Sequence, residues 1–124
     1  MLTVGTFVLN VRDLSRGIEF WRQALGYEPV RPPGDDWATL GPPSADGPRI
    51  SLQLSDDPPP EVPHSHLDLY AADAEDQAAQ IERLVGLGAT RVDWPLYPDG
   101  DRDFVVLADP DGNRFCVIDR SFGT

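Results

Sequence analysis

The chain of 124 residues repeats its own pattern at a spacing of sixty residues. In each half, an alternating strand segment is followed by an aspartate that can cap a helix, then by an amphipathic helix segment, and then by a glycine that can end it. The matched positions are Thr6 and His66, Asp13 and Asp73, and Gly26 and Gly86. Because start and stop signals agree at one spacing, we interpret the chain as two copies of one strand–helix–strands module.

The repeat also predicts the secondary structure. Apolar residues at helical spacing predict helices over 14–25 and 74–86. The stripe residues are Leu14, Ile18, Trp21 and Leu25 in the first helix, and Ala74, Ala78, Ile81 and Val85 in the second. Alternating or short apolar segments predict strands near 5–12, 37–41, 49–55, 65–71, 103–108 and 113–119. A short strand near 27–31 and its counterpart near 90–93 are expected to complete each sheet. This mixture predicts an α+β fold.

A proline-rich segment separates the two copies. Ser55–Pro63 reads SDDPPPEVP, and three consecutive prolines exclude a helix interior or a central strand. We therefore expect module 1 at about 1–57, a linker at about 56–63 and module 2 at about 64–122. Within module 2, Asp109–Gly112 (DPDG) predicts a turn between the last two strands.

Charge and cysteine content exclude several classes of function. Twenty-one acidic residues face ten basic ones, and the formal charge of −11 makes nucleic acid and anionic membranes poor partners. All basic residues are arginine, which excludes a P-loop lysine and lysine Schiff-base chemistry. A single cysteine excludes an internal disulfide and a multi-cysteine zinc site. With no apolar run of membrane-spanning length and no basic leader, we expect a cytoplasmic protein.

Three segments of the chain resemble a known family. They are Thr6–Tyr27 (TFVLNVRDLSRGIEFWRQALGY), His66–Asp73 (HLDLYAAD) and Phe104–Ile118 (FVVLADPDGNRFCVI). Together they resemble the small glyoxalase-like members of the glyoxalase / bleomycin-resistance / dioxygenase superfamily, also called vicinal oxygen chelate. The resemblance implies a single domain over 1–124, in which two tandem βαβββ modules form a cup-shaped mixed sheet. It also implies a homodimer.

The resemblance implies four positions for a metal site, one on the first strand and one on the last strand of each module. They fall on Thr6, Gln53, His66 and Cys116. Only His66 has the ligand type that is usual in the family, and this mixed set suits a hard cation poorly. We therefore expect no tightly bound metal and no cofactor. One divalent metal ion remains the alternative.

Polar and aromatic residues outside the helical stripes are the candidates for ligand binding. Residues two apart on a strand share a face, and the opposite face is apolar and faces the helices. The candidates are Thr6, Asn10, Trp37, Gln53, His66, Asp68, Trp94, Tyr97 and Cys116. His66 is also the candidate catalytic residue, as a hydrogen-bonding group or a base. The alternatives are a solvated polar sheet face and, for Cys116, a small core side chain.

Three functions are consistent with these features. The first is a metal-independent protein that binds a small molecule and sequesters a cationic or aromatic ligand, which the acidic charge favours. The second is a metal-dependent lyase, isomerase or dioxygenase with an atypical ligand set. The third is a regulatory module without chemistry in the cavity.

Overall fold

The structure is a computed structural model that describes residues 1–44 and 46–123; Ala45 and Thr124 lie outside the described residues. It divides into two compact units, unit 1 over Met1–Pro59 and unit 2 over Pro60–Thr124. The division falls inside the proline-rich segment. Each unit is described below by itself.

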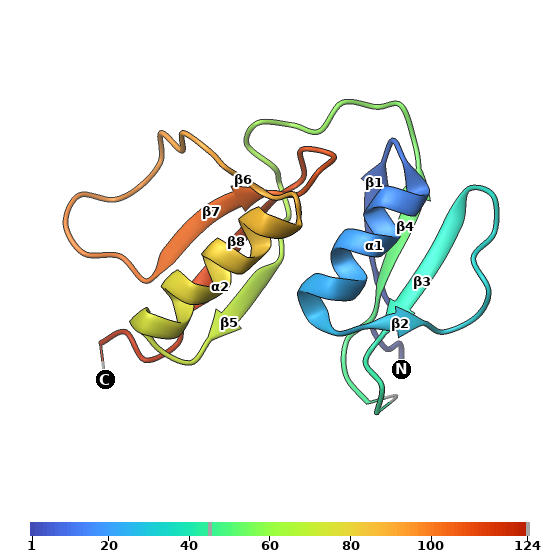
Figure 1. The fold of residues 1–124 in the computed structure, drawn as a ribbon, viewed down its shortest axis with the longest axis horizontal. Helices are drawn as coiled ribbons and strands as arrows, with labels where there is room; N and C mark the ends of the chain where they lie inside the picture. Colours follow the sequence, from blue (N-terminus) through green and yellow to red (C-terminus); the bar gives the residue numbers. More distant parts are fainter. Residues whose placement is uncertain (45, 124) are drawn as a thin grey trace. The chain divides into compact units, whose positions relative to one another are not determined.

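The two units have the same order of elements (Figure 1). Unit 1 contains β1 (Phe7–Val11), α1 (Leu14–Leu25), β2 (Glu28–Pro29), β3 (Trp37–Gly41) and β4 (Ile50–Leu54). Unit 2 contains β5 (Asp68–Ala71), α2 (Ala74–Leu87), β6 (Thr90–Arg91), β7 (Phe104–Ala108) and β8 (Arg114–Asp119). The prediction of an α+β fold made of two βαβββ modules is confirmed. None of the described helices is long and apolar enough to cross a membrane.

Each unit holds one four-stranded mixed sheet in which the first strand pairs with the last. The strand orders are β1-β4-β3-β2 and β5-β8-β7-β6, with the pairs β1–β4 and β5–β8 parallel and the other pairs antiparallel. Thr6 and His66, expected inside the first strands, lie just before β1 and β5. Because the first and last strands pair, residues from the beginning and the end of each module lie side by side in its sheet.

Capping aspartates begin both helices, as the sequence predicted. The carboxylate of Asp13 accepts a hydrogen bond from the Arg16 amide at 3.0 Å. In α2 the cap is reciprocal, because Asp73 accepts from the Asp76 amide and Asp76 accepts from the Ala72 amide, both at 2.8 Å. The hydrogen bond from Ala72 is the main cause that lowers the pKa of Asp76.

The ends of the two helices differ from each other. Gly26 ends α1 in the left-handed region at φ 68°, as expected. α2 continues through Gly86 to Leu87, and Gly88 at φ 120° ends it. The helix therefore ends one residue later than the sequence predicted. Gly88, and not the expected Gly86, has the positive φ.

Helix α1 packs closely on its sheet through Gly17. A Cβ at this position would lie 3.0 Å from Val11 Cγ1 and 3.3 Å from Leu52 Cδ1, so a larger residue would push the helix away. Trp21, fully buried, fills the next turn of the same face, and Phe20 meets it edge to face with 5.0 Å between ring centres. The predicted stripe is right at its centre but omits Gly17 and Phe20.

The predicted stripe of α2 is right only at Ile81. Ala74, Ala78 and Val85 are exposed, whereas Ile81 and Leu84 are buried. Gln77 completes the buried face, because its side-chain amide donates to the carbonyls of Asp103 at 3.0 Å and Val117 at 2.9 Å. Gln77, which the predicted stripe does not include, is thus held against the sheet by two backbone acceptors.

We expect Asp73→Ala to lower the free energy of unfolding by about 1 kcal/mol, because it leaves the Asp76 amide without its acceptor. Asp73→Ser keeps an oxygen acceptor and should lower it less. Urea denaturation followed by circular dichroism measures both variants. Equal losses for the alanine and serine variants would contradict the capping role.

Candidate functional site

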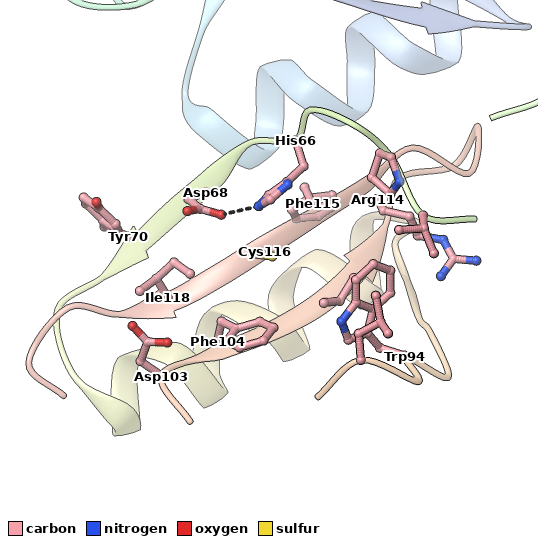
Figure 2. Close-up of a pocket in the computed structure, with 14 residues that line it drawn as sticks. His66, Asp68, Tyr70, Trp94, Asp103, Phe104, Arg114, Phe115, Cys116 and Ile118 are labelled. Atoms are coloured by element: carbon pink, nitrogen blue, oxygen red, sulfur yellow. Dashed lines mark ion pairs between the residues drawn. The ribbon is translucent and has the colours of Figure 1, made fainter. Parts of the chain in front are cut away.

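A cavity of about 460 Å³ lies in unit 2, on the face of its sheet opposite α2 (Figure 2). Strand alternation builds it, because every second residue of β5, β7 and β8 faces the same side. The lining residues are Val62, Pro63, His66, Asp68, Tyr70, Trp94, Leu96, Asp103, Phe104, Val106, Arg114, Phe115, Cys116 and Ile118. Most are apolar or aromatic and a few are polar, which is typical of a site for an organic molecule.

Three of the predicted site residues form a cluster in this cavity. His66 Nε2 lies 3.0 Å from Asp68 Oδ1, an ion pair when the imidazole is protonated (Figure 2). Asp68 pairs with Cys116 across the β5–β8 ladder, so the two side chains point to the same face. One ligand atom from each of the three residues lies within 4.8 Å of the other two. The carboxylate of Asp68 therefore faces both the imidazole and the thiol.

The thiol of Cys116 is held in its neutral form. Burial first, then the negative charge of Asp68 and the hydrogen bond to its carboxylate, and last the charge of Asp103, raise the pKa of Cys116 from its ordinary 9.0 to about 11. A thiolate is the reactive form of cysteine, so Cys116 is a poor nucleophile at neutral pH. The raised pKa stabilises the fold below pH 9, and this contribution is lost as the pH rises toward 11.

Aromatic side chains flank the cavity. Trp94, from the connection between β6 and β7, and Phe104, from β7, line it. Tyr97, predicted as a wall residue, is not among the lining residues. It lies against Phe104 with 5.4 Å between ring centres, and its hydroxyl accepts a hydrogen bond from the Val106 amide at 2.8 Å. The guanidinium of Arg102 covers its ring at 3.6 Å. Tyr97 therefore fixes the connection that carries Trp94.

The other four candidates lie in unit 1 and bond to their own neighbours. Trp37 Nε1 donates to Thr39 Oγ1 at 3.1 Å, and the Ser51 hydroxyl bonds to the hydroxyls of Thr39 and Thr6, each at 2.9 Å. Asn10 Oδ1 accepts from Gln53 Nε2 at 3.1 Å. The face of the unit 1 sheet opposite α1 therefore carries hydrogen-bonded hydroxyl groups, where unit 2 has the carboxylate of Asp68 and the imidazole of His66.

The ladders correct the alignment of the two last strands. Val8 pairs with Ser51 as Asp68 pairs with Cys116, so Ser51 is the counterpart of Cys116. The sequence comparison had placed Gln53 there. The offset between the modules is sixty on their first strands and sixty-five on their last, because the connection after β6 is longer than that after β2. Ser51, which is fully buried, therefore takes the place of Gln53 as the last-strand position of module 1.

Sequence reasoning missed several residues that line the cavity. Arg114 and Ile118 share the face of Cys116 by two-residue alternation along β8. On β7, Phe104 pairs with Ile118 and Val106 pairs with Cys116. The alternation of Arg114 with Cys116 was visible in the sequence, but a polar sheet face in contact with solvent explained it equally well. Tyr70 and Asp103 complete this group.

Comparison with known proteins assigns the family. The sequence model of the glyoxalase-like domain matches residues 6–118. The chain belongs to the glyoxalase-like domain family. The match covers both modules of this glyoxalase-like domain, whereas the comparison with curated proteins gave no significant match.

Solved structures share the fold of this glyoxalase-like domain. A glyoxalase/bleomycin resistance protein from Albidiferax ferrireducens is 21% identical, with TM-score 0.66 over 94% of this chain and 97% of that chain. A glyoxalase-related enzyme from Fulvimarina pelagi is 20% identical, with TM-score 0.70 over 95% and 88%. The fosfomycin resistance protein FosX from Listeria monocytogenes is 18% identical, with TM-score 0.74 over 98% and 94%. Another structure of FosX, a point mutant, is a complex with Mn(II) and 1S,2S-dihydroxypropylphosphonic acid.

The donor atoms in this domain fit some metals and not others. His66, Asp68 and Cys116 offer one nitrogen, one oxygen and one sulfur. These are donor types that zinc accepts, whereas manganese and magnesium prefer oxygen ligands. Metal binding would have to remove the thiol proton against a raised pKa, and Asp68 already holds His66 and Cys116. The cluster therefore fits zinc by donor type alone and fits a hard cation poorly.

We expect native Cys116 to react with iodoacetamide at pH 8 at least ~100-fold more slowly than in urea, because so little of it is thiolate. Asp68→Asn removes the neighbouring charge and should speed the reaction. Glu75→Gln, the same charge change on the exposed side of α2, should leave it unchanged. Alkylation rates followed by mass spectrometry against pH give the apparent pKa. A value near 8.5 in the native protein would contradict the assignment.

Proposed function

We propose that this domain binds a small organic molecule with an aromatic portion in the unit 2 cavity and sequesters it without a metal ion. The observation that carries the proposal is the cavity itself, with Trp94 and Phe104 beside the polar cluster of His66 and Asp68. Flat aromatic walls bind planar apolar groups, and a few polar groups fix their orientation. The two units act as one domain, which the family match across both supports.

Acidic side chains favour a basic group on this molecule. Asp68 and Asp103 both line the cavity, and the whole chain carries a formal charge of −11. A basic ligand would be attracted by the charge of the chain and paired with a carboxylate inside the cavity. His66 acts as a hydrogen-bonding group beside Asp68, with which it already pairs.

A second candidate is a metal-dependent lyase, isomerase or dioxygenase, and one observation favours it. The His66–Asp68–Cys116 cluster brings three donor atoms within 4.8 Å of one another, and a structural relative, FosX, has been crystallised with Mn(II). When bound, zinc would supply a Lewis acid that polarises an oxygen atom of the substrate. In that case His66 would bind the ion. Asp68 would either orient the imidazole of His66 or bind the ion directly. Stoichiometric zinc in the purified, untagged protein would favour this candidate.

We expect saturable quenching of tryptophan fluorescence when basic aromatic antibiotics are titrated into the protein. Trp94→Ala should weaken binding about tenfold, because it removes an aromatic wall. Trp94→Phe keeps a flat ring and should lose less. His66→Ala should also weaken binding, whereas a chelator should have no effect.

Two results of this titration would contradict the proposal. If Trp94→Ala and His66→Ala leave the affinity of every bound compound unchanged, the cavity is not the binding site. If a chelator abolishes binding, the metal-dependent candidate replaces the metal-independent one. Small 2-oxo compounds extend the same titration to the second candidate.

We also propose that the protein acts in the cytoplasm as a homodimer. A lone cysteine kept as a buried thiol fits a reducing compartment. The family resemblance supports the dimer, as do the exposed apolar side chains of Val8 and Tyr70 on the sheet faces opposite the helices.

We expect sedimentation equilibrium at tens of micromolar to give twice the chain mass of 13.6 kDa. Val8→Asp and Tyr70→Asp place charges on these two faces and should shift the equilibrium toward the monomer. Glu82→Ala on the exposed surface of α2 is the control. A wild-type protein of single-chain mass would contradict the homodimer.

A further inference from the structure

Arg114 is a partly buried arginine that lines the cavity without a partner for its charge. It begins β8, and the Asp109 turn fixes its place: the Asp109 carboxylate accepts hydrogen bonds from the amides of Asp111 at 2.9 Å and Asn113 at 2.8 Å. Among the described residues, no carboxylate lies within ion-pair distance of its guanidinium, and no hydrogen bond to it is formed. Its place in the lining of the cavity makes this charge available to a ligand.

Nearby acids do not neutralise Arg114. Glu61 and Asp93 line, together with Arg114, an adjoining hollow of about 370 Å³. Neither carboxylate is within ion-pair distance of the guanidinium in the part of the chain that the structure describes. The other arginine of this hollow, Arg91, is paired with Glu82. Arg114 therefore remains the cation available at the boundary of the two spaces.

The cavity is also divided by charge along β8. Arg114, Cys116 and Ile118 follow one another on the same face, and at roughly 3.3 Å per residue the first and last Cα atoms lie about 13 Å apart. Asp103 lies beside the Ile118 end, because its carbonyl accepts from the Asp119 amide at 2.7 Å. Figure 2 shows Arg114 and Trp94 toward one end and Asp103 and Tyr70 toward the other.

We infer that the molecule bound in this cavity carries an anionic group, a carboxylate, sulfonate or phosphonate, which the guanidinium of Arg114 receives beside the aromatic face of Trp94. A planar guanidinium binds such a group through two parallel hydrogen bonds. Since Asp103 lies at the opposite end, a ligand that spans the cavity is amphoteric, with its acidic group at Arg114 and its basic group at Asp103. This inference rests on the proposed aromatic binding function.

Two fluorescent probes of the same aromatic skeleton test the inference. One is 8-anilinonaphthalene-1-sulfonate, and the other is N-phenyl-1-naphthylamine, which lacks the sulfonate. We expect the sulfonate to bind the wild-type protein more tightly than the neutral probe does. Arg114→Gln should weaken the sulfonate about tenfold or more and leave the neutral probe unchanged, because a hydrogen bond to a charged group is lost.

A matched variant controls for net charge. Arg83→Gln makes the same charge change on the exposed surface of α2, across the sheet from the cavity, and should alter neither probe. Arg114→Lys keeps the charge without the planar fork and should recover only part of the sulfonate affinity. Circular dichroism of each variant verifies that it is folded.

The outcomes separate the inference from the proposed function. If both probes bind equally and Arg114→Gln changes neither, the anionic site is wrong and the aromatic cavity stands. If Arg83→Gln weakens the sulfonate as much as Arg114→Gln does, the effect comes from net charge and the inference is overturned. If neither probe shows saturable binding, the proposed function fails, and the inference fails with it.

Discussion

The parallel pairing of the first and last strands of each module is the constraint on which the site depends. In unit 2 it places Asp68 of β5 beside Cys116 of β8, although most of the module separates them in sequence. The helix between these strands covers one face of the sheet, so the residues on the other face are left to form a cavity. Once this pairing and the alternation of side chains are set, the positions of His66, Asp68, Cys116 and Arg114 follow.

The two modules have the same strand order but carry different polar groups on the sheet face opposite the helix. On the face of the unit 1 sheet opposite α1, the hydroxyl of Ser51 bonds to the hydroxyls of Thr6 and Thr39. On the corresponding face of unit 2, Asp68 faces an imidazole and a thiol at the edge of an open cavity. Hydroxyl groups that bond to one another have fewer free hydrogen-bonding positions for a ligand. A carboxylate that lines a partly apolar cavity can still accept hydrogen bonds from a ligand. The two modules therefore share one architecture and differ in the polar groups on this face of the sheet.

Much of this arrangement could be predicted from the sequence, for identifiable reasons. The caps at Asp13 and Asp73, the stop at Gly26 and the turn at Asp109 are local signals, and local signals do not depend on distant packing. The counterpart of Cys116 in unit 1 could not be fixed in this way, because it depends on the lengths of the connecting segments, which differ between the modules. Gln77 was missed for a related reason: its two carbonyl acceptors exist only once the sheet has formed. The isolated charge of Arg114 likewise depends on which acids lie near it in space.

The hydroxyl of Tyr97 has a consequence for how the sheet of unit 2 ends. Strand β6 has only two residues and pairs with Leu107 and Ala108, so it covers only part of the outer side of β7. The Val106 amide beyond this stretch donates to Tyr97 instead of to a strand. An uncovered row of backbone donors is a template for pairing with another chain, and such edges promote aggregation. Tyr97, whose ring lies against the guanidinium of Arg102, takes up the Val106 donor and so opposes strand addition at this position of the edge.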